Sequence, residues 1–190
     1  MDRVQALGRF GLEPGRPTLA VVGGSQGAEA LNRGVVEALN GTASKLQIIH
    51  VTGKSQVDAV RDAYAAKGAR AVVVDFVSEM DSLYSAADLV VSRAGAMAIA
   101  ELAAFGTPSV LVPIGRSSGD HQRENARAIA KAGGAILLEE RDDLPGRLTP
   151  ILEKLVDGDP VFEEMTRKLA PLAKPEAAKT ILEDLGRLVA

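Results

Sequence analysis

A glycine-rich loop at residues 23–28, with the sequence GGSQGA, has the composition of an anion-binding turn. Glycines let the backbone turn tightly and approach a ligand, and the N–H groups of a following helix would point at that ligand. A phosphate held there would gain from the helix dipole and from the hydroxyl of Ser25. The loop matches neither GxGxxG nor the Gly-Lys-Ser/Thr ending of a P-loop, so the alternative is a turn whose glycines serve packing alone.

A second loop combines Arg93 and Gly95 with small residues that lead into a helix. The small side chains would let a bulky group lie close to the backbone, and the amides of residues 96–98 are candidate donors to phosphate. Glu101 follows about one turn later, where its carboxylate could accept hydrogen bonds from two vicinal sugar hydroxyls. Taken alone, Glu101 could equally complement the helix N-terminus, and Arg93 could equally form a surface ion pair.

The third loop is polar and runs through residues 114–125. A helix that begins near residue 120 places Gln122 and Asn125 on one face, three residues apart. Histidine is a common general base in enzymes, so His121 could have that role. No serine, cysteine or carboxylate can be placed beside it by spacing, so we expect a capping or ligand-contact role instead.

These three loops follow strands in a regular alternation of strands and helices. We expect strands at residues 18–22, 46–51, 71–76, 89–92, 109–113 and 135–139, and helices at 2–11, 28–39, 55–67, 79–87, 96–105 and 121–132. The alternation predicts an α/β fold, a Rossmann-like parallel sheet of about six strands with helices on both faces. Ligands bind such sheets at the carboxyl ends of the strands, where the three loops lie.

The pattern of residues 143–190, the last part of the chain, predicts a helical tail. Two breaks interrupt it, at residues 157–160 and 174–175. Apolar stripes recur there at helical spacing: Val161, Met165 and Leu169 in one helix, and Ile181, Leu185 and Leu188 in the last. We expect both stripes to pack against the rest of the chain.

The composition excludes several classes of function. Of the 190 residues, 46% are hydrophobic and 25% are charged, as in ordinary globular domains. There is no cysteine, and His50 and His121 are the only histidines, so cysteine-ligated and multi-histidine metal centres are excluded. A net charge of −3 and 3% aromatic residues make nucleic acid an unsuitable partner. No apolar stretch is long enough for a membrane span or a signal region.

Three strings of the sequence resemble the carboxyl-terminal half of one family. They are GGSQGA at residues 23–28 together with Asn32, SRAGAMAIAELAAFGTPSVLVP at 92–113 and DHQRENA at 120–126. The family is the MurG family of peptidoglycan N-acetylglucosaminyltransferases, which make lipid II from lipid I. The likeness covers nearly the whole chain, including FVSEM at 76–80 and AGGAILL at 132–138. It implies the carboxyl-terminal half of an inverting GT-B glycosyltransferase, in which two Rossmann-like domains enclose the active site.

The resemblance also implies which residues bind the donor, UDP-N-acetylglucosamine. The glycine-rich loop would face the diphosphate or the sugar, the backbone of Val77 would face uracil, and residues 96–98 would hold phosphate and nucleoside. Glu101 would bind the ribose hydroxyls, and Gln122 the sugar hydroxyls. The full implied donor set is Gly24, Ser25, Gln26, Gly27, Asn32, Val77, Arg93, Gly95, Ala96, Met97, Ala98, Glu101, His121 and Gln122. We expect no catalytic residue, metal ligand or cofactor in this chain, because helix N-termini aimed at the diphosphate can stabilise its charge without a metal and the presumed base belongs to the other half.

A complete enzyme of this family is about twice as long, and its other half carries the acceptor site for lipid I and the membrane-facing surface. We therefore expect residues 1–190 to form a single, isolated donor domain, which binds UDP-N-acetylglucosamine and transfers no sugar. The final helix would cross to the missing acceptor domain. Without that domain, its apolar stripe would be either left exposed or buried in a dimer. The complete enzyme would be cytoplasmic, at the inner face of the membrane. The alternatives are the carboxyl-terminal subunit of a naturally split transferase, a non-catalytic nucleotide-binding module and half of a UDP-sugar epimerase.

Overall fold

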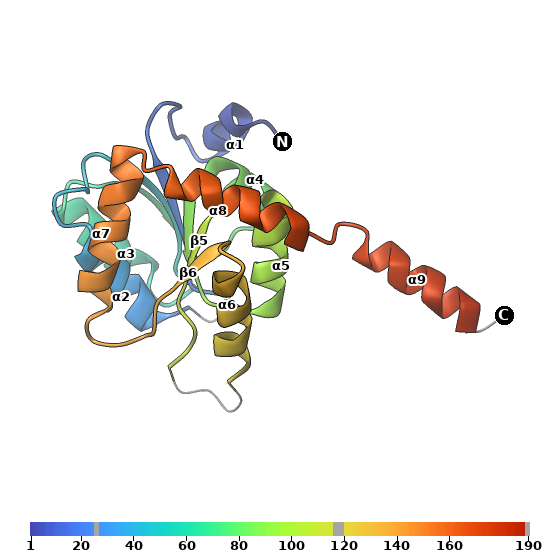
Figure 1. Cartoon of the computed structure of the whole chain (residues 1–190). Helices are drawn as coiled ribbons and strands as arrows, with labels where there is room; N and C mark the ends of the chain where they lie inside the picture. Colours follow the sequence, from blue (N-terminus) through green and yellow to red (C-terminus); the bar gives the residue numbers. More distant parts are fainter. Residues whose placement is uncertain (25–26, 116–119, 189–190) are drawn as a thin grey trace.

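A six-stranded parallel sheet forms the centre of the computed structural model, which describes residues 1–24, 27–115 and 120–188 (Figure 1). The strands are β1 (Thr18–Val22), β2 (Gln47–Val51), β3 (Arg70–Val74), β4 (Leu89–Ser92), β5 (Ser109–Leu111) and β6 (Ala135–Leu137). Their order across the sheet is β3-β2-β1-β4-β5-β6, and neighbouring strands are parallel. The predicted fold class is therefore confirmed.

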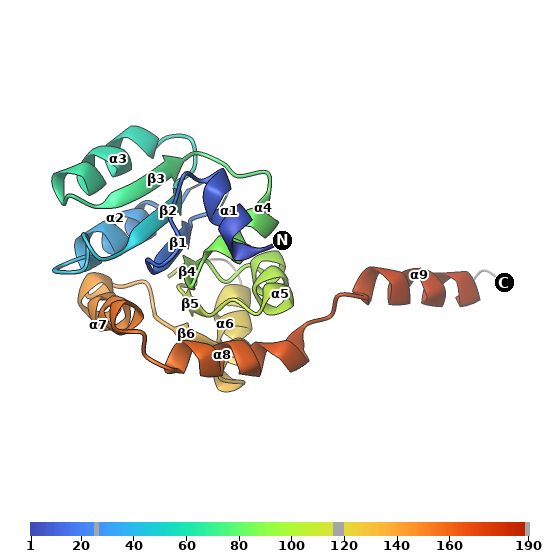
Figure 2. The ribbon, with the colours of Figure 1, turned by 90° about the horizontal axis from the view of Figure 1, so that it is seen from above.

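Helices cover both faces of the sheet (Figure 2). On one face lie α2 (Glu29–Ala38), α3 (Val57–Ala66) and α7 (Leu144–Asp157), and on the other lie α1 (Arg3–Arg9), α4 (Met80–Ala86), α5 (Ala96–Phe105) and α6 (His121–Lys131). Then follow α8 (Val161–Leu169), a short 3-10 helix (Ala170–Leu172) and α9 (Ala177–Leu188). The expected strands and helices of residues 1–140 are confirmed, with ends shifted by no more than two residues.

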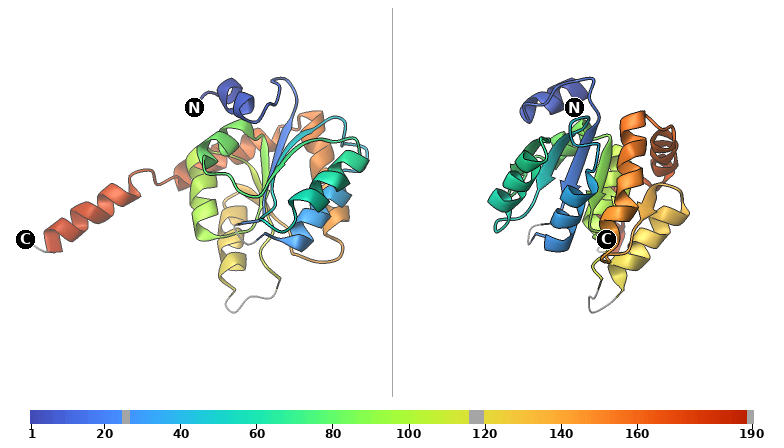
Figure 3. Two further views of the ribbon diagram at one scale, coloured as in Figure 1. Left: turned by 180° about the vertical axis from the view of Figure 1, so that it is seen from behind. Right: turned by 90° about the vertical axis from the view of Figure 1, so that its left-hand side faces the viewer.

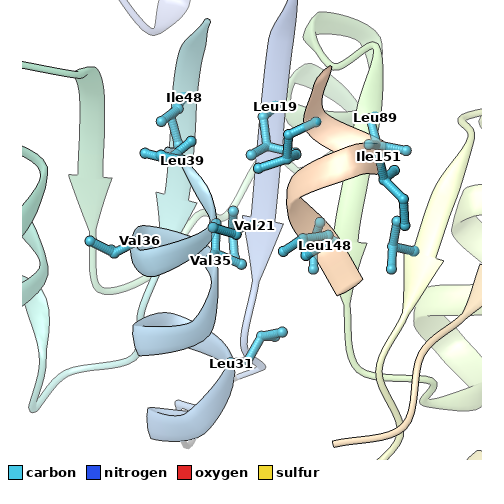
Figure 4. Close-up of a cluster of buried hydrophobic side chains, with 14 of the residues drawn as sticks. Leu19, Val21, Leu31, Val35, Val36, Leu39, Ile48, Leu89, Leu148 and Ile151 are labelled. Atoms are coloured by element: carbon cyan, nitrogen blue, oxygen red, sulfur yellow. The ribbon is translucent and has the colours of Figure 1, made fainter. Parts of the chain in front are cut away.

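The strands are apolar runs because both helix layers cover them. In β1, Leu19 and Val21 face the layer of α2 and α7, whereas Ala20 belongs to the core on the other face. Figure 4 shows Leu19 and Val21 beside Val35 of α2 and Leu148 of α7, and all four are fully buried. Burial of one such side chain contributes about 1.5–3 kcal/mol, so this two-sided core is a main source of stability.

The chain path reverses between β1 and β4. After β1 the chain runs outward through β2 and β3, then returns to place β4 on the other side of β1, and continues to β5 and β6. The two central strands end together, since Val22 pairs with Ser92. The loops after them turn to opposite faces, toward α2 and α5. Open α/β sheets bind their ligands at such a switch point.

The helical tail packs against the sheet and its helices only in its first part. Phe162, Met165 and Leu169 of α8 are buried. The expected packing of the last stripe is wrong, because Ile181 is 59% exposed and Leu185 is 53% exposed. The side chain of Leu188 is outside the described part of the structure. The α9 helix extends away from the other elements (Figure 1, Figure 2). Among the helices described, none has both the length and the apolar character needed to cross a membrane.

Candidate functional site

A cavity of about 380 Å³ opens at the carboxyl ends of β1 and β4. It lies between the three loops that the sequence singles out. Its lining residues are Val22, Gly23, Gly24, Gly27, Ser92, Arg93, Gly95, Ala98, Ile114 and Gln122. We name it the switch-point cavity.

A larger cavity, of about 520 Å³, lies at the opposite end of the strands. Asp88, which precedes β4, and Pro108, which precedes β5, are among its lining residues. These positions are the amino ends of parallel strands, whereas open sheets bind ligands at the carboxyl ends. The switch-point cavity is therefore the candidate site, although it is smaller.

Two glycines in the loop after β1 have a backbone conformation that other residues rarely adopt. The φ angle is +83° at Gly24 and +76° at Gly27, and both residues line the cavity. A Cβ on Gly27 would lie 2.6 Å from the carbonyl oxygen of Thr52, so only glycine allows this close approach. Ser25 and Gln26 lie outside the described residues, and their donor contacts stay predictions.

Beneath this loop, Asn32 joins α2 to β2 and to the start of α3. Its Nδ2 donates to the Thr52 carbonyl oxygen at 3.1 Å and to Gln56 Oε1 at 2.7 Å. Its Oδ1 lies 3.0 Å from His50 Nε2, and His50 Nδ1 lies 2.8 Å from the Tyr64 hydroxyl. Asn32 is 1% exposed, and its side chain supports the loop from below. A direct contact between Asn32 and the donor stays a prediction.

His50 is a neutral member of this buried network. Burial lowers the pKa of His50 to about 3, and burial raises the pKa of Tyr64. Asn32 Oδ1 can only accept a hydrogen bond, so Nε2 of the neutral imidazole carries the proton. Nδ1 then accepts from the Tyr64 hydroxyl. Both ring nitrogens are thus satisfied, as a buried imidazole requires.

The α5 helix begins at the cavity without a side-chain cap. Gly95 is its N-cap, and the first turn contains no acidic residue. A Cβ on Gly95 would meet no atom of the described residues within 4 Å. Ala98 lines the cavity, and Met97 is 78% exposed. The amides of residues 96–98 thus form a positive helix end that an anion can approach.

Arg93 is held by groups from the neighbouring strands. Its guanidinium donates to the Val112 carbonyl oxygen at 3.1 Å and to Glu140 Oε1 at 2.5 Å. Glu140 Oε2 in turn accepts from the amide of Gly115 at 3.1 Å. The ion pair considered from the sequence exists, but it is mostly buried rather than on the surface, with side chains 14% and 19% exposed. Arg93 also lines the cavity. Its contact with the donor stays a prediction.

Glu101 lies three residues after Ala98, and side chains at this spacing are neighbours on a helix surface. Its Oε2 accepts a hydrogen bond from the Tyr84 hydroxyl at 2.8 Å. Tyr84 comes from α4, which lies beside α5 (Figure 3). Since Glu101 is beyond the first turn of α5, it gains little from the helix dipole, and the capping alternative loses its support.

The α6 helix supplies Gln122 to the cavity. Gln122 Oε1 accepts from the amide of Ile114 at 3.3 Å, which joins the start of α6 to the loop after β5. Asn125 Nδ2 donates to the carbonyl oxygen of Ala94 at 3.3 Å, which joins α6 to the loop after β4. His121 is the first residue of α6 and is exposed. No nucleophile or carboxylate partner among the described residues is hydrogen-bonded to it.

The structure brings the predicted residues together to different degrees. The cavity lining includes Gly24, Gly27, Arg93, Gly95, Ala98 and Gln122 from the predicted donor set. Other members of that set are described by the structure but are not in the lining: Asn32, Val77, Ala96, Met97, Glu101 and His121. Contact with the donor stays a prediction for every residue of the set.

Sequence reasoning did not identify Glu140 or Tyr84. Glu140 comes shortly after the end of β6, so the preference of ligand-binding groups for carboxyl ends could have identified it. Tyr84 gives no local signal, because the residue that it contacts is 17 positions away on another helix.

Comparison with known proteins identifies the family. Residues 18–181 match the "Glycosyltransferase family 28 C-terminal domain". Two curated relatives carry the name "UDP-N-acetylglucosamine--N-acetylmuramyl-(pentapeptide) pyrophosphoryl-undecaprenol N-acetylglucosamine transferase". The relative from Anaeromyxobacter sp. strain K is 40% identical over 178 residues, which are 92% of this chain and 46% of the relative. The relative from Dechloromonas aromatica is 41% identical over 179 residues, which are 92% and 49% of the two chains.

A solved structure agrees with these relatives. MurG from Acinetobacter baumannii superposes with a TM-score of 0.84 at 30% identity, over 98% of this chain and 53% of that chain. The chain thus spans about half the length of the relatives that it matches. The resemblance to the MurG family and the assignment to the carboxyl-terminal half of a GT-B glycosyltransferase are confirmed. The chain belongs to glycosyltransferase family 28, whose C-terminal domain it contains.

Proposed function

We propose that this chain is the donor half of a transferase that moves N-acetylglucosamine from UDP-N-acetylglucosamine to lipid I and so forms lipid II. Family membership supports glycosyl transfer, and the names of the relatives supply the donor and the acceptor. One observation carries the placement of the donor. The uncapped N-terminus of α5, with Gly95 in front of it, opens into the switch-point cavity between β1 and β4.

In this proposal the diphosphate lies in the switch-point cavity. Amides of residues 96–98 donate to the phosphate oxygens, since such groups at a helix start favour an anion. The positive φ angles at Gly24 and Gly27 keep the opposite wall free of side chains, so the backbone can approach the diphosphate or the sugar. Gln122 binds hydroxyls of the N-acetylglucosamine through its Nε2, because its Oε1 already accepts from Ile114.

The nucleoside extends along α5 away from the cavity. Glu101 binds the ribose hydroxyls, and the backbone of Val77 binds uracil. Met97 offers an exposed apolar side chain beside the nucleoside. Arg93 and Asn32 act on the donor mainly through the loops, because their polar atoms bond to neighbouring protein groups.

Transfer with inversion breaks the bond between the sugar C1 and the diphosphate oxygen while the acceptor hydroxyl attacks from the opposite side. The bonding electron pair leaves with UDP, so negative charge develops on the β-phosphate. Preoriented amides at the start of α5 stabilise that charge in the transition state. The base that takes the proton from the acceptor hydroxyl belongs to the other half of the enzyme, and we assign no catalytic residue to this chain.

The 190-residue chain binds the donor but transfers no sugar, because lipid I and the cytoplasmic membrane surface are contacted by the acceptor domain of the complete enzyme. Formation of lipid II by these 190 residues alone would refute this division of labour.

Isothermal titration with UDP-N-acetylglucosamine tests the donor site. The Glu101→Ala variant should bind about tenfold more weakly or worse, because hydrogen bonds to a charged group contribute about 1.5–3 kcal/mol. Glu153→Ala is the matched control, since Glu153 is exposed on α7 and lies outside the cavity lining. Equal binding by both variants and the unmodified chain would contradict the proposed site. Titration with UDP, GDP and ADP separates a UDP-sugar site from a general nucleotide-binding module. A general module would bind the three nucleotides with similar affinity.

A further inference from the structure

Tyr84 is fixed in place by packing on the same face of the sheet as α5. Its side chain is 3% exposed, and its ring lies against that of Phe105, with 5.5 Å between the ring centroids. From this position its hydroxyl reaches Glu101 Oε2 at 2.8 Å. A rigid aromatic residue thus holds one oxygen of a flexible carboxylate.

The Glu101 carboxylate is partly exposed and has few partners in the described part of the chain. Among the described residues, Tyr84 is the one hydrogen-bond donor to it, and no cation lies within ion-pair distance. A carboxylate has about four acceptor positions, so Oε1 and part of Oε2 remain available. Burial and the hydrogen bond to Glu101 raise the pKa of Tyr84, which keeps the phenol protonated and donating near neutral pH.

We propose that Tyr84 is a positioning residue that orients the Glu101 carboxylate toward the two hydroxyls of the donor ribose, and so makes the site selective for ribonucleotides. This inference rests on the proposed function, because it takes the ligand to be a UDP-sugar. Tyr84 itself touches no substrate in this arrangement.

Selectivity follows from how the carboxylate is held. A vicinal diol donates to both carboxylate oxygens only when the carboxylate plane faces it, and the bond to Tyr84 restricts the rotamers of Glu101 to those that keep one orientation. A deoxyribose leaves one oriented acceptor unpaired, and a site built to bind a hydroxyl rejects the analogue that lacks it. Without the phenol, the carboxylate can turn toward solvent, and the missing hydroxyl matters less.

The test compares UDP with 2′-deoxyUDP on the intact 190-residue chain, by isothermal titration. The unmodified chain should prefer UDP by about tenfold, as expected for a lost hydrogen bond to a charged group. Tyr84→Phe keeps the ring and its packing, and it should reduce the preference to about threefold or less. Glu101→Gln should lose the preference, and adding Tyr84→Phe to Glu101→Gln should cause no further loss, because Tyr84 acts through Glu101.

Tyr64→Phe is the matched control, because it removes the same atom from the other buried tyrosine, on the opposite face of the sheet. It should change the affinities for both nucleotides by one common factor and leave their ratio at the unmodified value. A merely structural role for Tyr84 would give the same pattern in Tyr84→Phe.

The outcomes separate the two levels of the proposal. If UDP binds and Tyr84→Phe discriminates as strongly as the unmodified chain, the role of Tyr84 is overturned while the donor site stands. If the unmodified chain binds neither nucleotide, the donor site itself is overturned, and the role of Tyr84 with it.

Discussion

Gly27 lies so close to the carbonyl oxygen of Thr52 that a Cβ on Gly27 would be 2.6 Å from that oxygen. The same oxygen accepts a hydrogen bond from Asn32 Nδ2 at 3.1 Å. One backbone atom at the end of β2 therefore contacts both the loop after β1 and the first turn of α2. The position of one wall of the switch-point cavity depends on this contact.

Substitution of Gly27 by alanine should destabilise the chain by about 3 kcal/mol, because the change adds a left-handed backbone penalty and a clash with a backbone atom that cannot move freely. Gly24→Ala is the matched control. The φ of Gly24 is also positive, but a Cβ on Gly24 would have no atom of the described residues within 4 Å. We expect a loss of about 1 kcal/mol from backbone strain alone. Urea denaturation measures both, and equal losses would show that the Thr52 contact is unimportant.

The buried His50 should make stability depend on pH. Its pKa is about 3 in the folded chain against an ordinary value of 6.5, so between these values the unfolded chain binds one more proton than the folded chain. The free energy of unfolding should therefore fall by about 1.4 kcal/mol for each unit that the pH drops below 6.5, and this contribution should be constant above 6.5.

His50→Gln removes the titrating group and retains an amide that can bond to Asn32. The difference in unfolding free energy between the two chains should shrink as the pH falls from 6.5 toward 3. Parallel stability curves for the two chains across this range would contradict a buried neutral imidazole.

Gly95→Val should block donor binding without loss of stability. The φ of Gly95 is −66°, which valine adopts, and a Cβ meets no described atom within 4 Å. The added methyl groups would occupy the space in front of the amides of residues 96–98. Titration with UDP should show at least a tenfold loss, with the melting temperature unchanged within about 2 °C. Unaltered binding would place the anion somewhere other than the start of α5.

Removal of α9 should have little effect on the stability of the remaining chain. A chain that ends at Ala173 loses Ile181, Leu182 and Leu185, which are 59%, 69% and 53% exposed and so contribute little burial. We expect an unfolding free energy within about 0.5 kcal/mol of the full value, measured by urea denaturation. A loss of several kcal/mol would mean that α9 packs onto the other elements in solution.

The central sheet is predictable because its signal is local. The run at residues 18–22 is uninterrupted and apolar, and such a run has few alternatives to a strand covered on both faces. The position of the three loops then follows from the parallel arrangement alone, since every strand ends at the same edge. Gly24, Gly95 and Gln122 reach the cavity for this reason.

Contacts between distant segments are not predictable in the same way. The stripe of Ile181 and Leu185 has helical spacing, but spacing identifies an apolar face and not the surface that covers it. Asn32 belongs to a recognisable motif, yet its buried bonds to His50 and Gln56 depend on how α2 packs beside β2 and α3. The pairing of Tyr84 with Glu101 likewise arises only when α4 lies beside α5.

The uncapped start of α5 shows how a chain with a net charge of −3 can hold a region of positive potential. That potential comes from peptide dipoles, so it does not titrate in the ordinary pH range and needs no basic side chain. Residues 96–98 can therefore vary in evolution, provided that the helical backbone is kept. In the proposed donor site, the contact with the nucleoside could change in this way while the affinity for the diphosphate is retained.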